Sequence, residues 1–414
     1  MKQMSFERCY LITLCLFTGL WILFPHFTSF ILALFGFTVV YGIIKKELVF
    51  TFHLLPALLV LLYILYLVYA IPTNHLPIAL DFLEYKLSLL AFPFVLAFEP
   101  KFRVNWKYVF YSFLIAVLLL VIYDLAQASI HYAKTGVIKS FYSSALSPTH
   151  HPTYLTVFLS LAIMISLRFA KSADSPKLKI IFWGIIGLLV LLHVPLSSLS
   201  GMLFLVLFFS IAFIYSSVKL RKWSILLITA LTSGIIVFSA LKVQPSLSKN
   251  IENVIVLVNE YADSPKKFIQ TRPFPMQGNE ARLVVWTVAF DIFMEHPMGV
   301  GLGNLEEMMH QRLVHLGLNQ QAALNYNPHN QYLQIAAELG IIGLLLFLGI
   351  LLYGIVWAIS SKNWLLLLVI LSLAINCLFE SMLQRQSGIV FYCFWICLFS
   401  SRMYNKEIKV IFKD

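Results

Sequence analysis

Long runs of apolar residues recur along most of the chain, and shorter polar segments separate them. The runs are rich in Leu, Ile and Phe and do not alternate between apolar and polar positions, so they predict membrane helices and not the strands of a membrane barrel. We therefore expect an all-α polytopic membrane protein with about twelve transmembrane helices. The predicted spans cover residues 10–24, 27–44, 48–70, 85–98, 106–130, 152–170, 179–194, 200–217, 223–241, 341–359, 363–380 and 388–403.

One long segment interrupts this pattern between the ninth and tenth predicted spans, and loops of its length are usually functional or disordered. Within it, ARLVVWTVAFDIFMEH places apolar residues at helical spacing, HPMGVGLGN supplies turn residues, and LEEMMHQRLVHLGL resumes a helical pattern. The GVGLGN piece follows a helix and not a strand, which favours a turn over a nucleotide fingerprint. We predict transmembrane helices 1–9 in residues 1–241, a large helical loop in 242–330, transmembrane helices 10–12 in 331–403, and a tail in 404–414.

Composition supports the membrane interpretation, because 60% of the residues are hydrophobic and only 12% are charged, whereas soluble domains carry ~25% charged residues. The net charge of +11 does not indicate nucleic acid, since most of the 30 Lys and Arg residues fall on one side of the predicted spans. By the positive-inside rule, this side and both termini are expected in the cytoplasm, with the large loop on the external face. The first apolar run follows Lys2 and Arg8 like a signal peptide, but it lacks a small-residue cleavage site and is expected to be retained.

Polar and ionisable residues are rare inside the predicted spans and gather at their external ends. Ion-coupled transporters instead bury ionisable groups near the middle of the membrane and often contain internal repeats, which this sequence does not show. The pattern therefore favours chemistry at the external face over transport. The residues concerned are Asp81, Glu84, Lys86, His150, His151, Arg282, the segment 329–338, Glu380 and Arg385.

The segment NPHNQYLQIAAELGIIGLLLFLGIL leads a polar stretch directly into an apolar span. We expect Asn327 to cap this helix and Pro328 to occupy its first position. His329 would then lie in the first turn, where free N–H groups suit a phosphate and the helix dipole favours a neutral imidazole that can accept a proton. Asn330, Gln334 and Glu338 would form one polar stripe; the alternative is a capped helix whose stripe only meets water or a neighbouring loop.

Two further patterns have competing interpretations. Arg282 and Trp286 lie one helical turn apart and could form a binding pair, or Arg282 could pair with a carboxylate while Trp286 marks the membrane interface. The adjacent His150 and His151 in THHPTY could suggest a metal site, but neighbouring side chains point in different directions and no further ligand lies nearby. A metal is therefore not favoured.

Together, these motifs resemble those of the O-antigen ligase and polymerase superfamily of the bacterial inner membrane. The similarity lies in ARLVVWTVAFDIFMEHPMGVGLGN, in PHNQYLQIAAELGIIGLLLFL, in FESMLQRQSG before the last span, and in the large loop near the C-terminal third. The resemblance implies a GT-C-like helical bundle and a metal-independent glycosyltransferase without a cofactor. It also implies transfer of a glycan from undecaprenyl diphosphate to an acceptor, such as lipid A–core, at the periplasmic face.

Carried over to this sequence, Arg282 would bind the diphosphate and His329 would act as the base or as a further phosphate contact. The remaining substrate-binding set would be Asn330, Gln334, Glu338, Arg385, Lys86 and His151. The expected partners are the undecaprenyl-diphosphate-linked glycan donor, a lipid or glycan acceptor and membrane lipid, with no nucleic acid.

The sequence departs from the ligase pattern at Leu199, where an arginine is expected, so that a diphosphate ligand would be missing or supplied by Arg385 or Lys86. A repeat-unit polymerase is therefore kept as the alternative, and a transporter of lipid-linked sugars or a non-catalytic assembly protein as more distant ones.

Overall fold

The computed structural model describes residues 5–198, 200–208, 210, 234, 256–265, 267–268, 279–324, 327–402 and 404–405. Almost all regular structure in this part is helical, as expected for an all-α membrane protein. The α-helices are α1 (Phe6–Leu23), α2 (Thr28–Ile44), α3 (Leu54–Ala70), α4 (Leu76–Lys86), α5 (Ser88–Leu96), α6 (Trp106–Thr135), α7 (Ser143–Leu146), α8 (Pro152–Ser172), α9 (Pro176–Leu196), α14 (Asn279–Glu295), α15 (Leu305–His315), α16 (Asn319–Ala323), α17 (Gln331–Ser360), α18 (Trp364–Asn376) and α19 (Gln386–Ser400).

Two short 3-10 helices and two short strands complete the described elements. The 3-10 helices are η1 (Pro25–Phe27) and η2 (Ile138–Phe141), and β1 (Leu48–Phe50) pairs antiparallel with β2 (Phe98–Pro100). The strands lie at the ends of α2 and α5, where the apolar runs give way to charged residues. The sequence pattern did not predict this small ribbon.

Within the described residues, six helical segments are long and apolar enough to cross a membrane: Phe6–Leu23, Pro25–Ile44, Trp106–Thr135, Pro152–Ser172, Pro176–Leu196 and Gln331–Ser360. Shorter apolar helices are Leu54–Ala70, Trp364–Asn376 and Gln386–Ser400. The expected total of about twelve spans stays a prediction, because the span at 223–241 lies almost wholly outside the described residues, as do residues 209 and 211–217 of the span at 200–217 and parts of the loop 242–330.

Two predicted spans differ from the structure. The span at 48–70 begins with the strand β1, so that its helix α3 starts only at Leu54, and the span at 85–98 is not one continuous helix. The chain forms the nine-residue α5, which contains Pro93 and is separated from α4 by Leu87. At ~1.5 Å per residue, a helix of this length covers about 14 Å, roughly half the hydrocarbon thickness. The segment therefore forms a broken helix, and Lys86 ends α4 instead of starting a membrane span.

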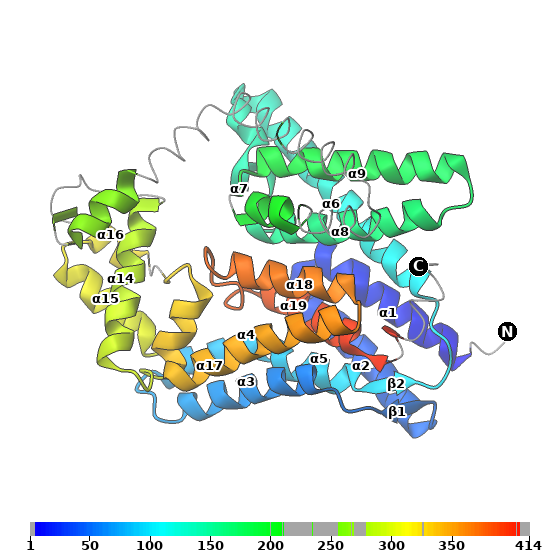
Figure 1. Ribbon diagram of the computed structural model, residues 1–414, viewed down its shortest axis with the longest axis horizontal. Coiled ribbons are helices and arrows are strands. Elements are labelled where there is room, and N and C mark those ends of the chain that lie inside the picture. Colours follow the sequence, from blue (N-terminus) through cyan, green and yellow to red (C-terminus); the bar gives the residue numbers. More distant parts are fainter. Residues whose placement is uncertain are drawn as a thin grey trace.

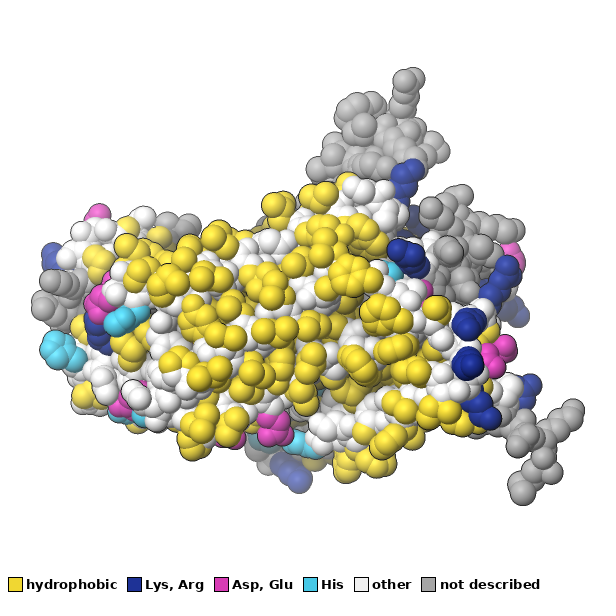
Figure 2. Space-filling view, turned by 90° about the horizontal axis from the view of Figure 1, so that it is seen from below, with side chains coloured by type: hydrophobic (Ala, Val, Ile, Leu, Met, Phe, Trp, Pro, Cys, Tyr) yellow, Lys and Arg dark blue, Asp and Glu magenta, His cyan; other side chains and the backbone are white. Residues whose placement is uncertain are grey.

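The long helices run roughly along the long axis of the molecule, with α14, α15 and α16 at one end and the β1–β2 ribbon at the other (Figure 1). We call these the α14 end and the ribbon end. Hydrophobic side chains cover most of the face between them, whereas Lys and Arg side chains gather mainly at the ribbon end (Figure 2). This distribution is the one expected of a bundle whose middle faces lipid.

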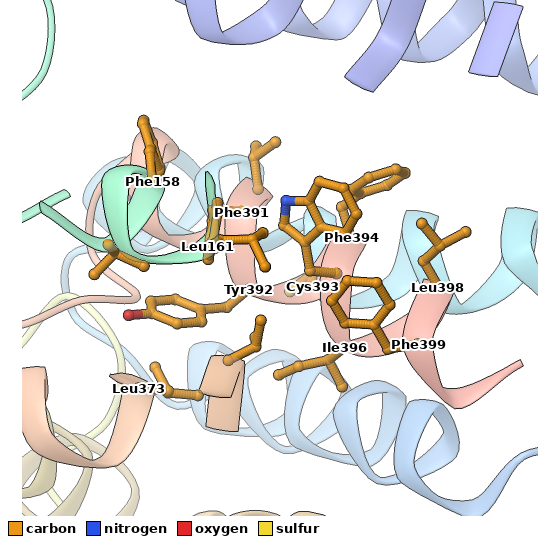
Figure 3. Close-up of a cluster of buried hydrophobic side chains, with 14 of the residues drawn as sticks. Phe158, Leu161, Leu373, Phe391, Tyr392, Cys393, Phe394, Ile396, Leu398 and Phe399 are labelled. Atoms are coloured by element: carbon orange, nitrogen blue, oxygen red, sulfur yellow. The ribbon is translucent and has the colours of Figure 1, made fainter. Parts of the chain in front are cut away.

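The core of the bundle is built around α19, which is apolar on all sides and therefore fits a fully enclosed position. Every residue from Gly388 to Ser400 is buried. Phe391, Tyr392 and Phe394 of α19 lie among side chains of neighbouring helices, including Phe158 of α8 and Leu373 of α18 (Figure 3). This packing fixes the start of α19, and so the connection between α18 and α19, relative to the rest of the molecule.

A sharp break divides α17 at Gly340, whose backbone angles (φ 66°, ψ −164°) are accessible essentially only to glycine. The turn after α14 docks against this break through three backbone hydrogen bonds. They run from Val300 N–H to Ala337 O (2.9 Å), from Gly301 N–H to Glu338 O (3.0 Å) and from Ile341 N–H to Pro297 O (2.9 Å). Beyond the break, residues 341–360 are about 30 Å long, enough to cross the hydrocarbon core. This part coincides with the predicted span 341–359.

Candidate active site

The candidate site lies toward the α14 end, where three parts of the chain meet (Figure 1). Arg282 is supplied by α14, His329 by the segment before α17, and Glu380 by the connection between α18 and α19. Segments that are distant in sequence thus bring their polar side chains to one place. The predicted catalytic residues Arg282 and His329 are among them.

Glu380 is the centre of this arrangement. Glu380 is only 5% exposed to solvent. One carboxylate oxygen, Oε1, lies 2.9 Å from Nδ1 of His329, and the other, Oε2, lies 3.9 Å from Nη2 of Arg282. Glu380 was recognised as a polar residue at the external face but was not assigned to the site, because no local motif links it to His329, which is 51 positions away in sequence.

The surroundings of Glu380 favour its ionised form. Burial raises the pKa of this carboxyl group, but the hydrogen bond from His329 and the electrostatic effects of His329, His151 and Arg282 act in the opposite direction and prevail. The net result is a pKa below the ordinary glutamate value of 4.5. Glu380 is therefore a carboxylate at neutral pH, and it can accept the Nδ1 proton of His329.

The backbone around His329 differs from the expectation that Asn327 caps α17. The cap is Asn330, whose Oδ1 accepts the N–H groups of Tyr332 and Leu333 at 3.0 and 3.1 Å. Asn327 instead accepts the N–H of His329 at 2.9 Å, and His329 takes a left-handed conformation with φ 47°. His329 therefore precedes the helix, in a turn that presents its ring to Glu380.

This correction also removes the proposed phosphate site on the first turn of α17. The N–H of Gln331 donates to the backbone oxygen of Cys377 at 2.8 Å, and Asn330 takes the next two N–H groups. The first three donors of the helix are thus already used within the protein, so they are not available to an anion. An anion at this site has to be bound by side chains.

Two further predicted residues, His151 and Arg385, lie in the same electrostatic neighbourhood. His151 caps α8 with its side chain, and Arg385 is exposed immediately before α19. Burial lowers the pKa of His151; the positive charges of Arg385, Arg282 and His329 lower it further, against the opposing effect of Glu380. His151 is therefore expected to be neutral at pH 7, which makes it a hydrogen-bonding group.

The other predicted binding residues form a separate, buried network. Lys86 and Glu338 are 0% exposed and Gln334 is 1% exposed. Their hydrogen bonds run from Lys86 Nζ to Gln384 Oε1 (2.7 Å), from Gln384 Nε2 to Glu338 Oε1 (3.3 Å) and from Gln334 Nε2 to Glu338 Oε1 (2.6 Å). Through Gln384, this network ties α4 and α17 to the connection that carries Glu380 and Arg385. Direct substrate contact by Lys86, Gln334 or Glu338 stays a prediction.

Residues at the start of α17 hold the same connection from another side. Gln331 Oε1 accepts the N–H of Leu383 at 2.7 Å, and Asn330 Nδ2 donates to the backbone oxygen of Leu378 at 3.2 Å. Both ends of the Asn330 amide take part in capping α17 and supporting the connection, and the substrate contact expected of Asn330 stays a prediction. The position of Glu380 is therefore determined by backbone contacts on either side of it.

Glu306 of α15 lies close to the buried network. Burial and the negative charge of Glu338 raise the pKa of Glu306 to about 7, against the effect of Lys86. Two carboxylates thus share the neighbourhood of one lysine. Charge is balanced there when one of the two carries a proton.

The remaining sequence candidates have structural explanations. The GVGLGN piece forms a turn in which Gly299, Gly301 and Gly303 have φ of 87°, 93° and 86°. His150 is buried and bonds with Ser387 and the backbone oxygen of Ile22. Across the described ranges, His, Cys, Asp and Glu form no group of three suited to a metal ion.

Comparison with protein families adds the decisive observation. Residues 180–348 match the family described as O-antigen ligase. This part of the chain is similar to the O-antigen ligase family. The resemblance to the superfamily is thereby confirmed, and an activity of the ligase or polymerase type, with lipid-linked glycans as substrates in general, is supported. No similar sequence was found among curated proteins.

The matched residues include α14 and α17 as far as residue 348, but not the whole site. Arg282 and His329 fall within the matched residues, whereas Lys86, His151 and Glu380 fall outside them. The site therefore combines side chains of the matched region with side chains of the surrounding bundle.

Proposed function

We propose that this O-antigen ligase-like protein transfers a glycan from undecaprenyl diphosphate to an acceptor, such as lipid A–core, at the periplasmic face of a bacterial inner membrane. The observation that carries the proposal is the Glu380 carboxylate between His329 and Arg282, at the α14 end of a lipid-facing bundle. The basic ribbon end supports a cytoplasmic location for the opposite face.

His329 is proposed as the general base. When Nδ1–H donates to Glu380, the basic lone pair of a neutral imidazole is on Nε2. The acceptor hydroxyl gives its proton to Nε2 while its oxygen attacks the anomeric carbon of the donor sugar. The bond from that carbon to the diphosphate oxygen breaks, and undecaprenyl diphosphate leaves. Glu380 stabilises the imidazolium that forms and is not itself protonated.

Arg282 is proposed to bind the diphosphate of the donor. Its side chain is 33% exposed and its contact with Glu380, at 3.9 Å, is loose. A guanidinium has five N–H donors, so Arg282 can keep this contact and still bind two phosphate oxygens. Arg385, which is exposed beside the same site, would supply a second positive charge for the leaving group.

The buried network of Lys86, Gln384 and Glu338 is proposed to position the connection between α18 and α19. A charged lysine enclosed in the protein is tolerated only when it is paired and hydrogen-bonded, and here it also lies 4.7 Å from the ring of Tyr66. Loss of one member would leave the others unpaired. We therefore assign Lys86 to the support of Glu380 and not to direct contact with substrate.

The test is transfer of lipid-linked glycan by purified variants. A positioned base contributes about 10²–10⁴-fold, so His329→Ala should lower kcat by that range while the protein stays inserted and folded. His315→Ala is the matched control, because His315 is an exposed histidine at the end of α15. Wild-type kcat in a stable His329→Ala protein would show that His329 is not the base.

A polymerase is the second candidate, because the family match covers both activities and Leu199 stands where the ligase pattern has an arginine. Leu199 lies outside the described residues. A deletion strain separates the two. Loss of all long-chain surface glycan with accumulation of lipid-linked polymer indicates a ligase, whereas single repeats attached to the acceptor indicate a polymerase.

In the same deletion strain, the leaflet in which the lipid-linked substrate accumulates distinguishes a ligase or polymerase from a transporter. Periplasmic accumulation agrees with a transferase, and cytoplasmic accumulation with a transporter. Transfer by the purified protein would exclude a non-catalytic assembly role.

A further inference from the structure

A cavity lies at the ribbon end of the molecule, beside the residues that follow β1. Its volume is about 400 Å³, within the usual range of small-molecule sites, ~300–1,000 Å³. The segment after β1, the end of α17 and the residues around the end of α19 line it. Ser400, at the end of α19, lines the cavity, whereas Glu380 lies before the opposite end of that helix, so the proposed glycan transfer does not explain the cavity.

The cavity lining combines apolar and polar groups. Phe52, Tyr353 and Trp357 provide an aromatic surface, and Phe52 is 62% exposed. The polar lining includes His53 and Arg402. A lining of this kind fits an amphipathic ligand better than a wholly polar one, because a polar ligand would leave the aromatic surface uncovered.

Arg402 is the cation of the cavity. Its side chain is exposed, and no carboxylate pairs with its guanidinium among the residues that the structure describes. Glu99 is engaged by other groups, since its Oε1 lies 2.7 Å from His53 Nε2 and accepts the backbone N–H of Arg402 at 2.9 Å. The guanidinium is therefore able to bind an anionic group in the cavity.

The surface around the cavity is basic as well. Exposed lysines stand on the turn before β1, on the residue after β2 and directly after Ser361, which lines the cavity; Glu47 is the exposed acid among them. The space-filling view shows Lys and Arg gathered at this end (Figure 2). The lysines are Lys45, Lys46, Lys101 and Lys362. Basic segments at the cytoplasmic surface attract the anionic lipids of that leaflet.

We propose that this cavity binds one anionic phospholipid of the cytoplasmic leaflet. Its phosphate lies on Arg402, and an acyl chain lies along Phe52, Tyr353 and Trp357. Inorganic phosphate would use the cation alone, and a zwitterionic lipid would gain little from the basic surface. The proposal depends on the orientation of the bundle in the membrane and is independent of glycan transfer.

Native mass spectrometry of the purified full-length protein provides the test, with phosphatidylglycerol, phosphatidylcholine and inorganic phosphate as probes. We expect one phosphatidylglycerol to be retained in preference to phosphatidylcholine. Arg402→Ala should weaken this retention about tenfold or more, the effect of one charge-assisted hydrogen bond. Phe52→Ala should weaken it by a smaller factor, because the exposed ring contributes only apolar contact.

Arg103→Ala is the matched control, since Arg103 is an exposed arginine near the end of β2 that does not line the cavity. Its phosphatidylglycerol affinity should equal that of the wild type, and thermal unfolding should confirm that all variants are folded. Equal retention of the two lipids, equal losses in Arg402→Ala and Arg103→Ala, or displacement of the lipid by inorganic phosphate would each overturn the proposal.

Discussion

Replacing Glu380 with glutamine tests the proposed site most directly. The change removes one negative charge but keeps the size of the side chain and a carbonyl oxygen that can accept the Nδ1 proton of His329. Since Glu380 is 5% exposed and lies 2.9 Å from His329 and 3.9 Å from Arg282, both partners lose their anion at once. The imidazolium that forms during transfer then has no carboxylate to stabilise it.

The structure gives the scale of this effect. At 3.9 Å and an effective dielectric constant of ~20, the gross attraction between Arg282 and the carboxylate is about 4 kcal/mol before desolvation is subtracted. The hydrogen bond to His329 is the better guide to the net effect, because bonds to charged groups contribute about 1.5–3 kcal/mol. A loss of that size from the transition state lowers the rate about 10- to 150-fold.

The assay is glycan transfer by purified Glu380→Gln protein under saturating donor and acceptor. We expect kcat to fall by this factor with a smaller change in KM, because the charge acts mainly on the imidazolium of the transition state. Glu307→Gln is the control: Glu307 is an exposed acid on α15 that bonds with Gln311, and its loss should leave the rate unchanged. A folded Glu380→Gln protein with wild-type kcat would refute the role given to Glu380.

Three further predictions concern the helices around the site. Gly340→Ala should lower the free energy of unfolding by at least about 1–3 kcal/mol, measured by thermal unfolding, because its backbone angles suit only glycine; Gly349→Ala, in the same helix with open space around it, should be neutral or slightly stabilising. Arg282→Lys should lower kcat/KM about 10²–10³-fold by removing two-point phosphate binding, whereas Arg312→Lys, in an ion pair at the surface, should not change it; equal activities would contradict the assignment of Arg282. The pKa of Glu306 is raised from 4.5 to about 7 in the folded protein. The contribution of its protonated form to folding stability is therefore fully present below pH 4.5 and is lost as the pH rises through 7. Glu306→Gln should therefore raise the melting temperature at about pH 8 but not at about pH 4, and a gain that does not depend on pH would contradict this explanation.

Local patterns predicted part of this structure well. The break of α17 at Gly340 places the apolar helix at the residues predicted to span the membrane, because a glycine followed by a long apolar run marks both the end of one segment and the start of the next. The turn at HPMGVGLGN was expected for the same reason, since closely spaced glycines after a proline suit a tight reversal. His329 and Arg282 were selected by motif, and they do meet at one site.

Contacts between distant segments could not be predicted in this way. Lys86 and Gln384 are 298 positions apart, and nothing in either segment shows that they bond. The polar stripe with Gln334 and Glu338 has the same spacing whether it faces water or another helix, so its burial became evident only from the folded chain. Asn327 and Asn330 are equally good caps by residue type, and the choice between them depends on the left-handed turn at His329.

The backbone hydrogen bonds between the turn after α14 and the break in α17 limit the insertions and exchanges that this part of the sequence can tolerate. His329 directly precedes the cap of α17 and Gly340 lies within the helix. A single inserted residue between them would therefore rotate the start of α17 by ~100° and shift it by ~1.5 Å. Insertions in that interval should be selected against. Chimaeras that exchange parts with related proteins should also take residues 297–301 and 337–341 from the same parent, because the two pieces match each other atom by atom along the backbone.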